Sequence, residues 1–403
     1  MRYVVICSPL RLPVGGFGGS FKTVQAHDLA SHIVKELMSR TGVPAEAVED
    51  CVFAQCYPSM EAPALGRVVA LDAGLTTGTG GIQIDRRCGS GLQSVIYAIM
   101  QIATGASDVM IAGGAESMSN APFFSTKMRW DIKGDGLMLH DALTRGRYTA
   151  GGKHHPVEGG MIETAENLRR EYNISREAQD EFSVNSHKKA AAAQESGKFD
   201  KEIVPYTVKG RKADTVVSKD EHIRPDSSME KLSKLRALRG KVDPDATVTA
   251  GNASGQNDGA AACIVCTREA ADKYGLTPLA RLVSWSVAGV GPEVMGIGPV
   301  PSSQKALDRA GLKISDIDVI ELNEAFASQV LACTTALGFE KEDYERLNPN
   351  GSGISLGHPV GATGVRILTT MLYEMERQEA KYGLETMCIG GGQGLAAIFE
   401  RVS

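Results

Sequence analysis

The sequence has no long apolar run and no large excess of charge of one sign. No stretch reaches the roughly 18 apolar residues that a membrane-spanning helix needs. The opening residues, MRYVVICSPLRLPVG, also lack the apolar region and cleavage site of a signal peptide. With 43 Lys and Arg against 48 Asp and Glu, the net charge is −5, which argues against nucleic acid or an anionic membrane as a partner. We therefore expect a cytoplasmic protein that binds small molecules.

Cysteine and aromatic residues are scarce, whereas glycine is abundant. The 8 Cys among 403 residues do not form the dense pattern of a disulfide-stapled secreted protein, so we expect reduced thiols. Cys263 and Cys266 form one CxxC motif, but no second pair at zinc-ligand spacing follows, and the surrounding AACIV is typical of a buried strand. We predict no metal site. The 45 Gly indicate many tight turns.

Short apolar runs alternate with segments of helical periodicity, which is the pattern of an α/β protein. At about 150 residues per domain, the length suggests two or three domains. The runs that predict strands lie at 3–6, 108–112, 261–265, 318–322 and 386–390. The segments that predict helices lie at 25–40, 92–100 and 365–375.

Two stretches share one plan: a glycine-rich turn, an apolar helix, a short strand and a glycine cluster. One runs from CGSG at 88–91 to DVMIAGG, and the other from GHPVGATG at 357–364 to TMCIGGG, which indicates an internal duplication. The segment 119–249 between them differs in character. It has a polar helix that begins after Ser175 as N-cap, and 23 Lys and Arg minus 20 Asp and Glu give it a balance of +3. It is either a solvated cap or a lid that meets a phosphorylated ligand.

Two cysteines stand in glycine-rich segments. Cys88, in RRCGSGLQS, directly precedes an expected helix, where the helix dipole and free N–H groups lower the pKa of a thiol and favour a nucleophilic thiolate. Cys388, in TMCIGGGQG, lies at the carboxyl end of an expected strand, where ligands of open α/β sheets bind. The N–H groups of the glycines after Cys388 are suited to a developing oxyanion. The alternative for each cysteine is a buried thiol that only packs.

Three polar residues are further candidates. His358, in SLGHPVGATG, lies in a turn that leads into an expected helix, a place where a base can be held near a cleft; the alternative is a structural histidine. Asn323 and Glu324, in ELNEAF, lie where a strand ends and a helix starts. They fit an Asn N-cap followed by a Glu that the helix dipole favours, or site residues, and both interpretations can hold together.

Taken in order, these segments resemble the thiolase family over the whole chain. The matching segments are SPLRLPVGGFGGS, CGSGLQS, GGAESMSNAP, TAGNASGQNDGAA, NEAFA, GHPVGATG and CIGGGQGLA. The resemblance implies two duplicated, five-stranded α/β/α halves packed into a five-layered αβαβα core. It implies an N-terminal half made of 1–118 plus about 250–270, a loop domain at 119–249 that holds coenzyme A (CoA), and a C-terminal half at 271–403.

The resemblance also implies roles for the site residues. Cys88 is the acylated nucleophile, His358 activates it, and Cys388 is the acid/base at the α-carbon. Asn323 holds a water that forms one oxyanion hole with His358, while the N–H groups of Cys88 and Gly390 form the other. CoA and acyl-CoA are then substrates, no cofactor or metal is needed, and a homodimer or homotetramer is expected.

Contacts to the substrate carry over from the family as well. Arg224, Ser254 and Leu235 are expected to contact CoA, and Met161, Met295 and Phe326 are expected to line the acyl pocket. The chain departs from the usual family pattern at three places: Gly160 replaces a common His, Asp85 replaces a frequent Asn, and CYPSMEAPALGR replaces a segment used in subunit contacts. Loss of the side chain at Gly160 removes a CoA contact or widens the pocket.

The leading hypothesis is a thiolase that makes acetoacetyl-CoA from two acetyl-CoA or cleaves longer 3-ketoacyl-CoA. A decarboxylating ketoacyl synthase shares the duplicated architecture, but typically lacks a second cysteine in a CxGGG segment, so Cys388 argues against it. A catalytically silent lipid-binding relative is expected to have lost some of the catalytic groups, all of which are present here. Chain length of the acyl group and direction of the reaction stay open.

Overall fold

The computed structural model describes residues 2–130, 134 and 136–402. Its strands are β1 (Val4–Arg11), β2 (Gly15–Gly16), β3 (Asp50–Ala54), β4 (Ile82–Ile84), β5 (Val109–Ser117), β6 (Phe123–Phe124), β7 (His140–Asp141), β8 (Tyr206–Val208), β9 (Thr215–Val217), β10 (Asn257–Thr267), β11 (Pro278–Gly289), β12 (Val319–Leu322), β13 (Tyr382–Ile389) and β14 (Gln393–Arg401). Its α-helices are α1 (Ala26–Thr41), α2 (Leu65–Asp72), α3 (Ser90–Ala103), α4 (Ala142–Thr149), α5 (Gly160–Glu171), α6 (Arg176–Glu195), α7 (Met229–Ser233), α8 (Arg268–Tyr274), α9 (Pro299–Ala310), α10 (Ala327–Ala336), α11 (Asp343–Arg346), α12 (Gly353–Leu356) and α13 (Thr363–Arg377).

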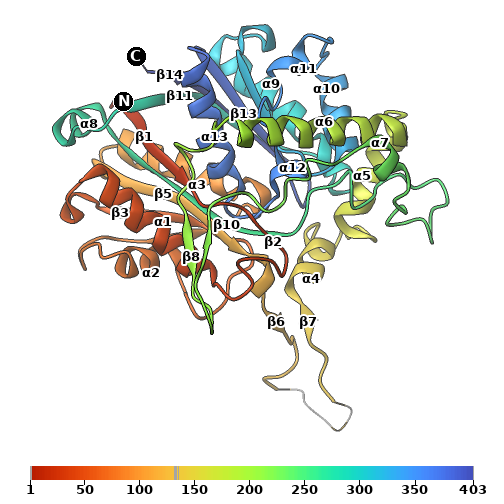
Figure 1. The fold of residues 1–403 in the computed structure, drawn as a ribbon, viewed down its shortest axis with the longest axis horizontal. Helices are drawn as coiled ribbons and strands as arrows, with labels where there is room; N and C mark the ends of the chain where they lie inside the picture. The colour runs from red at the N-terminus through yellow and green to blue at the C-terminus, as the bar shows by residue number, and fades with distance from the viewer. Residues whose placement is uncertain (1, 131–133, 135, 403) are drawn as a thin grey trace.

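The main sheet repeats one topology twice (Figure 1). Its strand order is β12-β13-β14-β11-β1-β10-β5-β3-β4, with β2 beside β10. In the N-terminal half, β3 is parallel to β5, and β5, β10 and β1 follow as antiparallel neighbours. In the C-terminal half, β12 is parallel to β13, and β13, β14 and β11 follow in the same way. The duplicated α/β architecture expected from the sequence is therefore confirmed.

The expectation of five strands in each half is wrong for the C-terminal half. Within the described residues, that half contributes four strands to the sheet, and the position that corresponds to β4 is reduced to a single parallel bridge between Ile320 and Leu347. Asn348, directly after the bridge, has a positive φ of 45°, and Pro349 follows it. The bridge cannot extend because a left-handed residue and a proline both interrupt strand geometry.

Three apolar cores separate the layers. The outer core of the N-terminal half packs α1 and α2 on one face of its sheet, with Leu29, Ile33 and Leu65 fully buried. The central core places α3 and α13 between the two halves, and the outer core of the C-terminal half packs α9 and α10 on the far face. This arrangement is the α-β-α-β-α order of layers. The two halves also join through β1 and β11, at Ile6 with Ala280 and Cys7 with Pro278.

The long helices begin and end close to the predicted residues. α1 ends before Gly42, which has a φ of 66° and so takes the left-handed conformation that favours glycine. α6 begins after Ser175, whose Oγ accepts a hydrogen bond from the Ala178 N–H at 3.1 Å. Helical periodicity and capping residues together predict where these helices begin and end, because both are local properties of the sequence.

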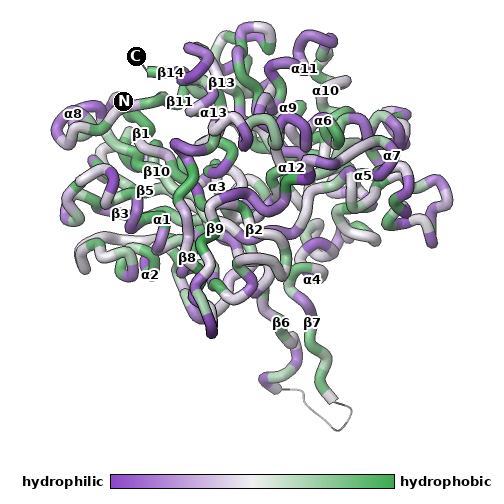
Figure 2. Tube along the Cα trace, viewed as in Figure 1, coloured by the Kyte–Doolittle hydropathy of each residue, from purple (hydrophilic) through white to green (hydrophobic). Residues whose placement is uncertain are grey.

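The segment 119–249 is fastened to the core by a buried ion cluster. Arg11 on β1 lies 2.6 Å from Glu202 and 2.7 Å from Asp220, and all three side chains are buried. Another part of this segment, the arm formed by β6 and β7, extends away from the body of the molecule (Figures 1 and 2). The domain boundaries at 118/119, 249/250 and 270/271 stay predictions.

Cys263 and Cys266 are both buried in β10, but in different cores. Cys263 contributes to the central core and Cys266 to the outer core of the N-terminal half, because a spacing of three residues puts side chains on opposite faces of a strand. Among the described residues there is no helix with the length and apolarity that crossing a membrane requires.

Candidate active site

Cys88 lies in a tight turn at the start of α3. The 3₁₀ turn Arg87–Gly89 leads directly into the helix, and Arg87 has a φ of 46°, a strained value for a residue with a long side chain. All eight cysteines lie in the described part of the chain, and Cys88 is the one that is not fully buried. The strained turn thus presents this thiol and no other to an incoming molecule.

Glycines bring the starts of α3 and α13 into backbone contact. A Cβ at Gly91 would lie 2.8 Å from the backbone N of Val365, and a Cβ at Gly364 would overlap the backbone N of Leu92. No other residue fits at either position without moving a helix. The turns that precede the two helices carry Cys88 and His358, so this contact places the nucleophile segment beside the histidine segment.

The His358 ring is oriented by a threonine from the same turn. Its Nδ1 lies 2.6 Å from Thr363 Oγ1, and this hydroxyl donates its proton to the Pro359 carbonyl at 2.9 Å. Because the hydroxyl has one proton, it must accept from Nδ1–H, which leaves Nε2 as the unprotonated nitrogen. Nε2 is buried and has no hydrogen-bond partner, as a base awaiting a proton requires. The sequence analysis missed Thr363, although it follows the GHP segment.

The backbone around His358 is fixed by two buried polar side chains that the sequence analysis also missed. The His358 N–H donates to Asn257 Oδ1 at 2.9 Å, and a side chain at Gly357, which has a φ of 95°, would collide with that amide. Glu116 accepts from the N–H groups of Cys56 and Gly361. Burial raises the pKa of Glu116 to about 7, against the effect of these hydrogen bonds. Both residues act on the position of the histidine turn.

The expected depression of the Cys88 pKa is wrong. Burial raises the pKa of the Cys88 thiol, and the Gly390 N–H and the Arg87 guanidinium oppose that rise only in part. Burial, then the charges of Arg366 and Arg147, lower the pKa of His358 to about 3. Desolvation outweighs the helix dipole here, so the resting pair is a neutral thiol and a neutral imidazole. The thiol consequently needs a base to become a nucleophile.

Cys388 and Gly390 lie next to Cys88. Cys388 is near the end of β13 and fully buried, and burial followed by the charge of Cys88 raises its pKa well above 9.0. The Gly390 N–H forms a hydrogen bond with the Cys88 sulfur. The structure therefore brings both thiols and one oxyanion donor together, as the sequence analysis expected.

Asn323 has a buried side chain whose amide nitrogen and oxygen both lack a hydrogen-bond partner. Its neighbour Glu324 is bound on every side, by Ser186 Oγ at 2.6 Å, Asn348 Nδ2 at 2.9 Å and the Ile354 N–H at 3.2 Å. The helix cap expected at Asn323 is wrong, because α10 begins only at Ala327. The amide is thus available to hold a water or a substrate oxygen.

The expected acyl-pocket residues gather around Cys388. Met295 and Phe326 form an apolar cluster with it, and Met161 packs against that cluster. Ser254 is close by, since its N–H donates to the Ala325 carbonyl at 2.9 Å. Arg224 and Leu235, in contrast, are exposed residues of the segment 119–249, and neither belongs to the apolar cluster.

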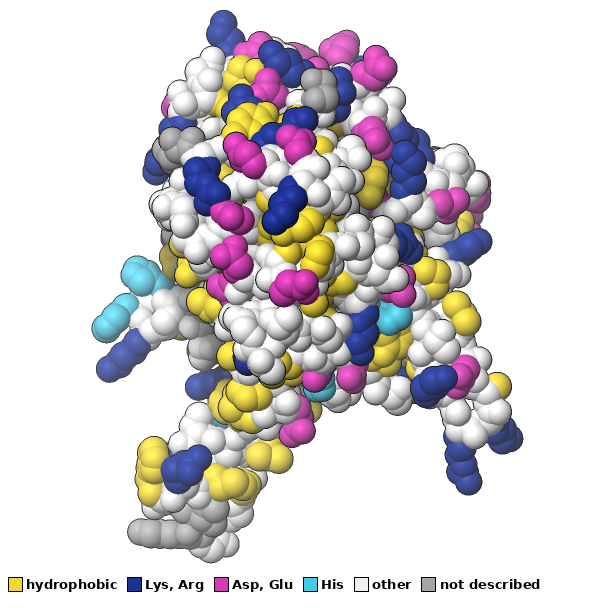
Figure 3. Space-filling view, turned by 90° about the vertical axis from the view of Figure 1, so that its left-hand side faces the viewer, with side chains coloured by type: hydrophobic (Ala, Val, Ile, Leu, Met, Phe, Trp, Pro, Cys, Tyr) yellow, Lys and Arg dark blue, Asp and Glu magenta, His cyan; other side chains and the backbone are white. Residues whose placement is uncertain are grey.

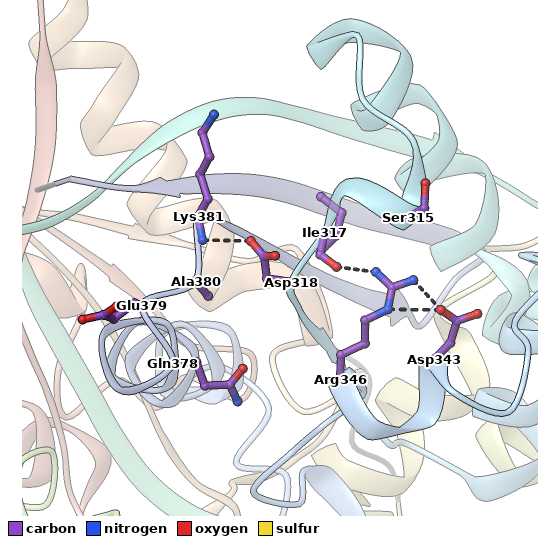
Figure 4. Close-up of a pocket in the computed structure, with 9 residues that line it drawn as sticks. All are labelled: Ser315, Ile317, Asp318, Asp343, Arg346, Gln378, Glu379, Ala380 and Lys381. Carbon is purple, nitrogen blue, oxygen red and sulfur yellow. Dashed lines mark hydrogen bonds and ion pairs between the residues drawn. The ribbon is translucent and has the colours of Figure 1, made fainter.

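A separate surface pocket lies where α13 ends and β12 begins (Figure 4). It is lined by Ser315, Ile317, Asp318, Asp343, Arg346, Gln378, Glu379, Ala380 and Lys381. Its charged groups form hydrogen bonds with other residues that line the pocket. For example, Asp318 Oδ2 accepts a hydrogen bond from the Lys381 N–H at 2.8 Å. None of the candidate catalytic residues lines it, so we assign it no part in the chemistry.

Known protein families, curated proteins and solved structures match this sequence over nearly its whole length. The family models "Thiolase, N-terminal domain" and "Thiolase, C-terminal domain" match residues 4–269 and 276–401. Beta-ketothiolase BktB of Cupriavidus necator is 47% identical, with all of both chains covered. Beta-ketoadipyl-CoA thiolase of Pseudomonas aeruginosa is 45% identical, again with both chains fully covered. The structure of Bacillus anthracis acetyl-CoA acetyltransferase is 41% identical, has a TM-score of 0.94, and covers 100% of this chain and 99% of its own.

Proposed function

Because this chain belongs to the thiolase family, we propose that its Cys88, His358, Cys388, Asn323 and Gly390 carry out the family's reaction. The enzyme is an acyltransferase that catalyses the reversible condensation and thiolysis of acyl-CoA. The relatives have different printed names, among them acetyl-CoA acetyltransferase and beta-ketoadipyl-CoA thiolase, so the acyl group of the substrate is a separate question.

In the direction of thiolysis, Cys88 Sγ attacks the 3-keto carbon while His358 Nε2 takes the thiol proton. The bond between C2 and C3 then breaks, which leaves the acyl group on Cys88 and the enolate of acetyl-CoA. Cys388 donates its proton to C2 of that enolate, and acetyl-CoA leaves. Free CoA gives its thiol proton to the Cys388 thiolate, and its sulfur attacks the acyl carbon and expels Cys88, which recovers its proton from His358. The two half-reactions make the kinetics ping-pong.

Two sets of donors suit the two oxyanions. We expect a water bound to the unpartnered Asn323 amide, together with His358, to stabilise the enolate oxygen, and the N–H groups of Cys88 and Gly390 to stabilise the tetrahedral oxygen at the acyl carbon. The observation that supports the proposal most directly is the buried, unpartnered Nε2 of a tautomer set by Thr363. A histidine with only a structural role would use both ring nitrogens.

We also propose that the enzyme forms a homodimer or homotetramer. The arm has exposed apolar side chains on β6 and in the described residues between β6 and β7: Phe123, Phe124, Met128, Leu137, Met138, Leu139 and Trp130, the last 81% exposed. In the space-filling view, hydrophobic side chains gather along this arm (Figure 3). A contiguous apolar surface of this kind fits a second copy better than solvent. Light scattering of the wild type and of Trp130→Ser tests the assembly.

Mass spectrometry of Cys88→Ala tests the proposed nucleophile. After incubation with acetoacetyl-CoA, the wild type should gain the mass of an acetyl group on the peptide that contains residue 88. Cys88→Ala should show neither this adduct nor thiolysis, while its circular dichroism stays unchanged. The Cys56→Ala variant is the matched control, because Cys56 is a buried neighbour of this turn and should not be needed for acylation. An adduct on Cys388 or Cys56 would overturn the assignment.

A further inference from the structure

Arg147 has its guanidinium group beside Gln256, two residues after Ser254 of the candidate site. It lies on α4, and a Cβ at Gly160 would be 3.4 Å from Arg147 Cβ. At the end of the same helix, the Ala150 carbonyl would be 2.7 Å from a Cβ at Gly391, one residue after the oxyanion donor Gly390. Helix α4 therefore lies against the turn that carries Gly390, and Arg147 packs beside Gly160.

Two electrostatic effects locate the Arg147 charge near the reacting groups. The pKa of His358 is lowered first by burial, then by the charge of Arg366, and then by the charge of Arg147. Burial raises the pKa of Tyr57 to about 12, and Arg87 and Arg147 oppose that rise. The Arg147 charge thus acts on both His358 and Tyr57.

Arg147 is partly buried and forms no ion pair among the described residues. Its charge does reach Asp141 at the start of α4, where, against burial, hydrogen bonds from Thr144 and Leu143 and then Arg147 lower the pKa of the carboxyl. With the Gln256 amide turned so that its oxygen faces Arg147, that oxygen accepts from Nη1 at 3.1 Å and from Nη2 at 2.9 Å. Among the described residues, no carboxylate lies within ion-pair distance of Arg147. The neighbouring Arg87 differs, since it pairs with Asp85 at 3.4 Å, donates to the Cys56 carbonyl at 2.8 Å and stacks on the Tyr57 ring.

The acyl group of a simple 3-ketoacyl-CoA is neutral and gives no reason for this charge, and the phosphates of CoA are at the opposite end of the substrate from the acyl chain. A partly buried cation without a counter-ion is costly, because it loses hydration and gains no ion pair. A carboxylate is the group that a guanidinium binds most specifically, with two parallel hydrogen bonds. A ligand carboxylate that reaches Arg147 from Cys88 would be at the far end of the acyl group.

We propose that Arg147 is a specificity residue that selects 3-ketoacyl-CoA substrates whose acyl chain ends in a carboxylate. This inference rests on the proposed function, because it requires that Cys88 carries the acyl group. During thiolysis, the carboxylate stays bound to Arg147 while the bond between C2 and C3 breaks. The products are acetyl-CoA and the CoA thioester of a dicarboxylic acid.

The test compares two substrates of equal length, the mono-CoA thioester of 3-oxohexanedioic acid and 3-oxohexanoyl-CoA. The wild type should have the higher kcat/KM for the substrate with the carboxylate. Arg147→Gln should lower the ratio of the two kcat/KM values about 10- to 100-fold, the usual range for a hydrogen bond to a charged group. Arg147→Lys should retain part of the preference, because it keeps the charge. Arg145→Gln, an exposed arginine on the same helix, should leave the ratio unchanged.

The outcomes separate this inference from the proposed function. If the wild type cleaves both substrates and Arg147→Gln lowers both values equally, Arg147 supports α4 or an oxyanion and the inference is wrong. A wild type that prefers 3-oxohexanoyl-CoA, which lacks the terminal carboxylate, also overturns the inference. If the wild type cleaves neither these substrates nor acetoacetyl-CoA, the proposed function itself fails.

Discussion

Thr363 Oγ1 lies 2.6 Å from His358 Nδ1 and donates its own proton to the Pro359 carbonyl. One hydroxyl thus fixes the tautomer of the ring and leaves Nε2 as the buried, unpartnered nitrogen. This bond connects the first turn of α13 with proton transfer at the nucleophile.

Replacement of Thr363 by Val should lower kcat/KM for acetoacetyl-CoA by about tenfold or more, as a fraction of the 10²- to 10⁴-fold that a general base contributes. Valine keeps the shape of the side chain but cannot accept from Nδ1–H, so the ring loses its orientation. Thr363→Ser should restore most of the activity, because it returns the hydroxyl. A purely structural role would instead lower the melting temperature of Thr363→Val with no loss of activity in the folded enzyme.

The rate of Cys88 alkylation by iodoacetamide should rise with pH. Burial raises the pKa of this thiol and lowers that of His358 to about 3, so at neutral pH neither group is charged. Below the thiol pKa, the thiolate fraction grows about tenfold per pH unit. We expect the alkylation rate to rise steadily between about pH 6 and 9. The rate is measured by mass spectrometry of the peptide that contains residue 88. A rate that is independent of pH in this range would show a thiolate–imidazolium pair.

Cys388→Ser should separate the two half-reactions. Acylation of Cys88 by a simple acyl-CoA, and exchange of the acyl group between thiols, needs no proton at an α-carbon and should survive. Condensation and thiolysis should fall about 100-fold or more, because a serine hydroxyl is a much weaker acid than a thiol. The measurement is the rate of acetyl exchange between CoA and a pantetheine thiol, beside the thiolysis rate. Equal loss of both rates contradicts the separate roles.

Arg224→Ala should raise the KM for acetoacetyl-CoA several-fold with little change in kcat. The residue is exposed, and a contact with the nucleotide phosphates would be remote from the reacting carbon, so it affects ground and transition states alike. Such a contact is worth on the order of 1 kcal/mol and weakens as salt rises. Lys219→Ala, a nearby exposed control, should change nothing. With an acyl-pantetheine that lacks the nucleotide, Arg224→Ala should equal the wild type; a loss with both substrates implies a structural role.

The sequence predicted the fold well because the fold depends on local signals. Helical period placed α1, α3 and α13, and the repeated glycine plan predicted the duplication that the strand pairing confirms. The reason for two of those glycines became visible only in three dimensions, where Gly91 and Gly364 allow two helices to touch.

The electrostatics of the site could not be predicted in the same way. A helix N-terminus suggested a lowered pKa for Cys88, yet burial raises it, and the extent of burial depends on segments far away in the chain. Thr363 and Asn257 lie in segments that carry the family resemblance, but nothing in those segments points to their contacts with His358, and Arg147 lies in no such segment. Asn257 and Arg147 gain their roles from neighbours more than 90 residues away, which composition and spacing do not reveal.

The strand order has a consequence for biosynthesis. In each half, the strand that completes the sheet comes last in the chain: β10 lies between β1 and β5, and β14 lies between β13 and β11. During synthesis, β1 cannot pair with β10 until residues Asn257–Thr267 have been made. The long sequence separation between the two strands slows their pairing. The growing chain exposes unpaired strand edges during that time, which makes it prone to aggregation. A nonsense mutation within Gln393–Arg401 would remove an interior strand, so we expect it to abolish folding of the C-terminal half.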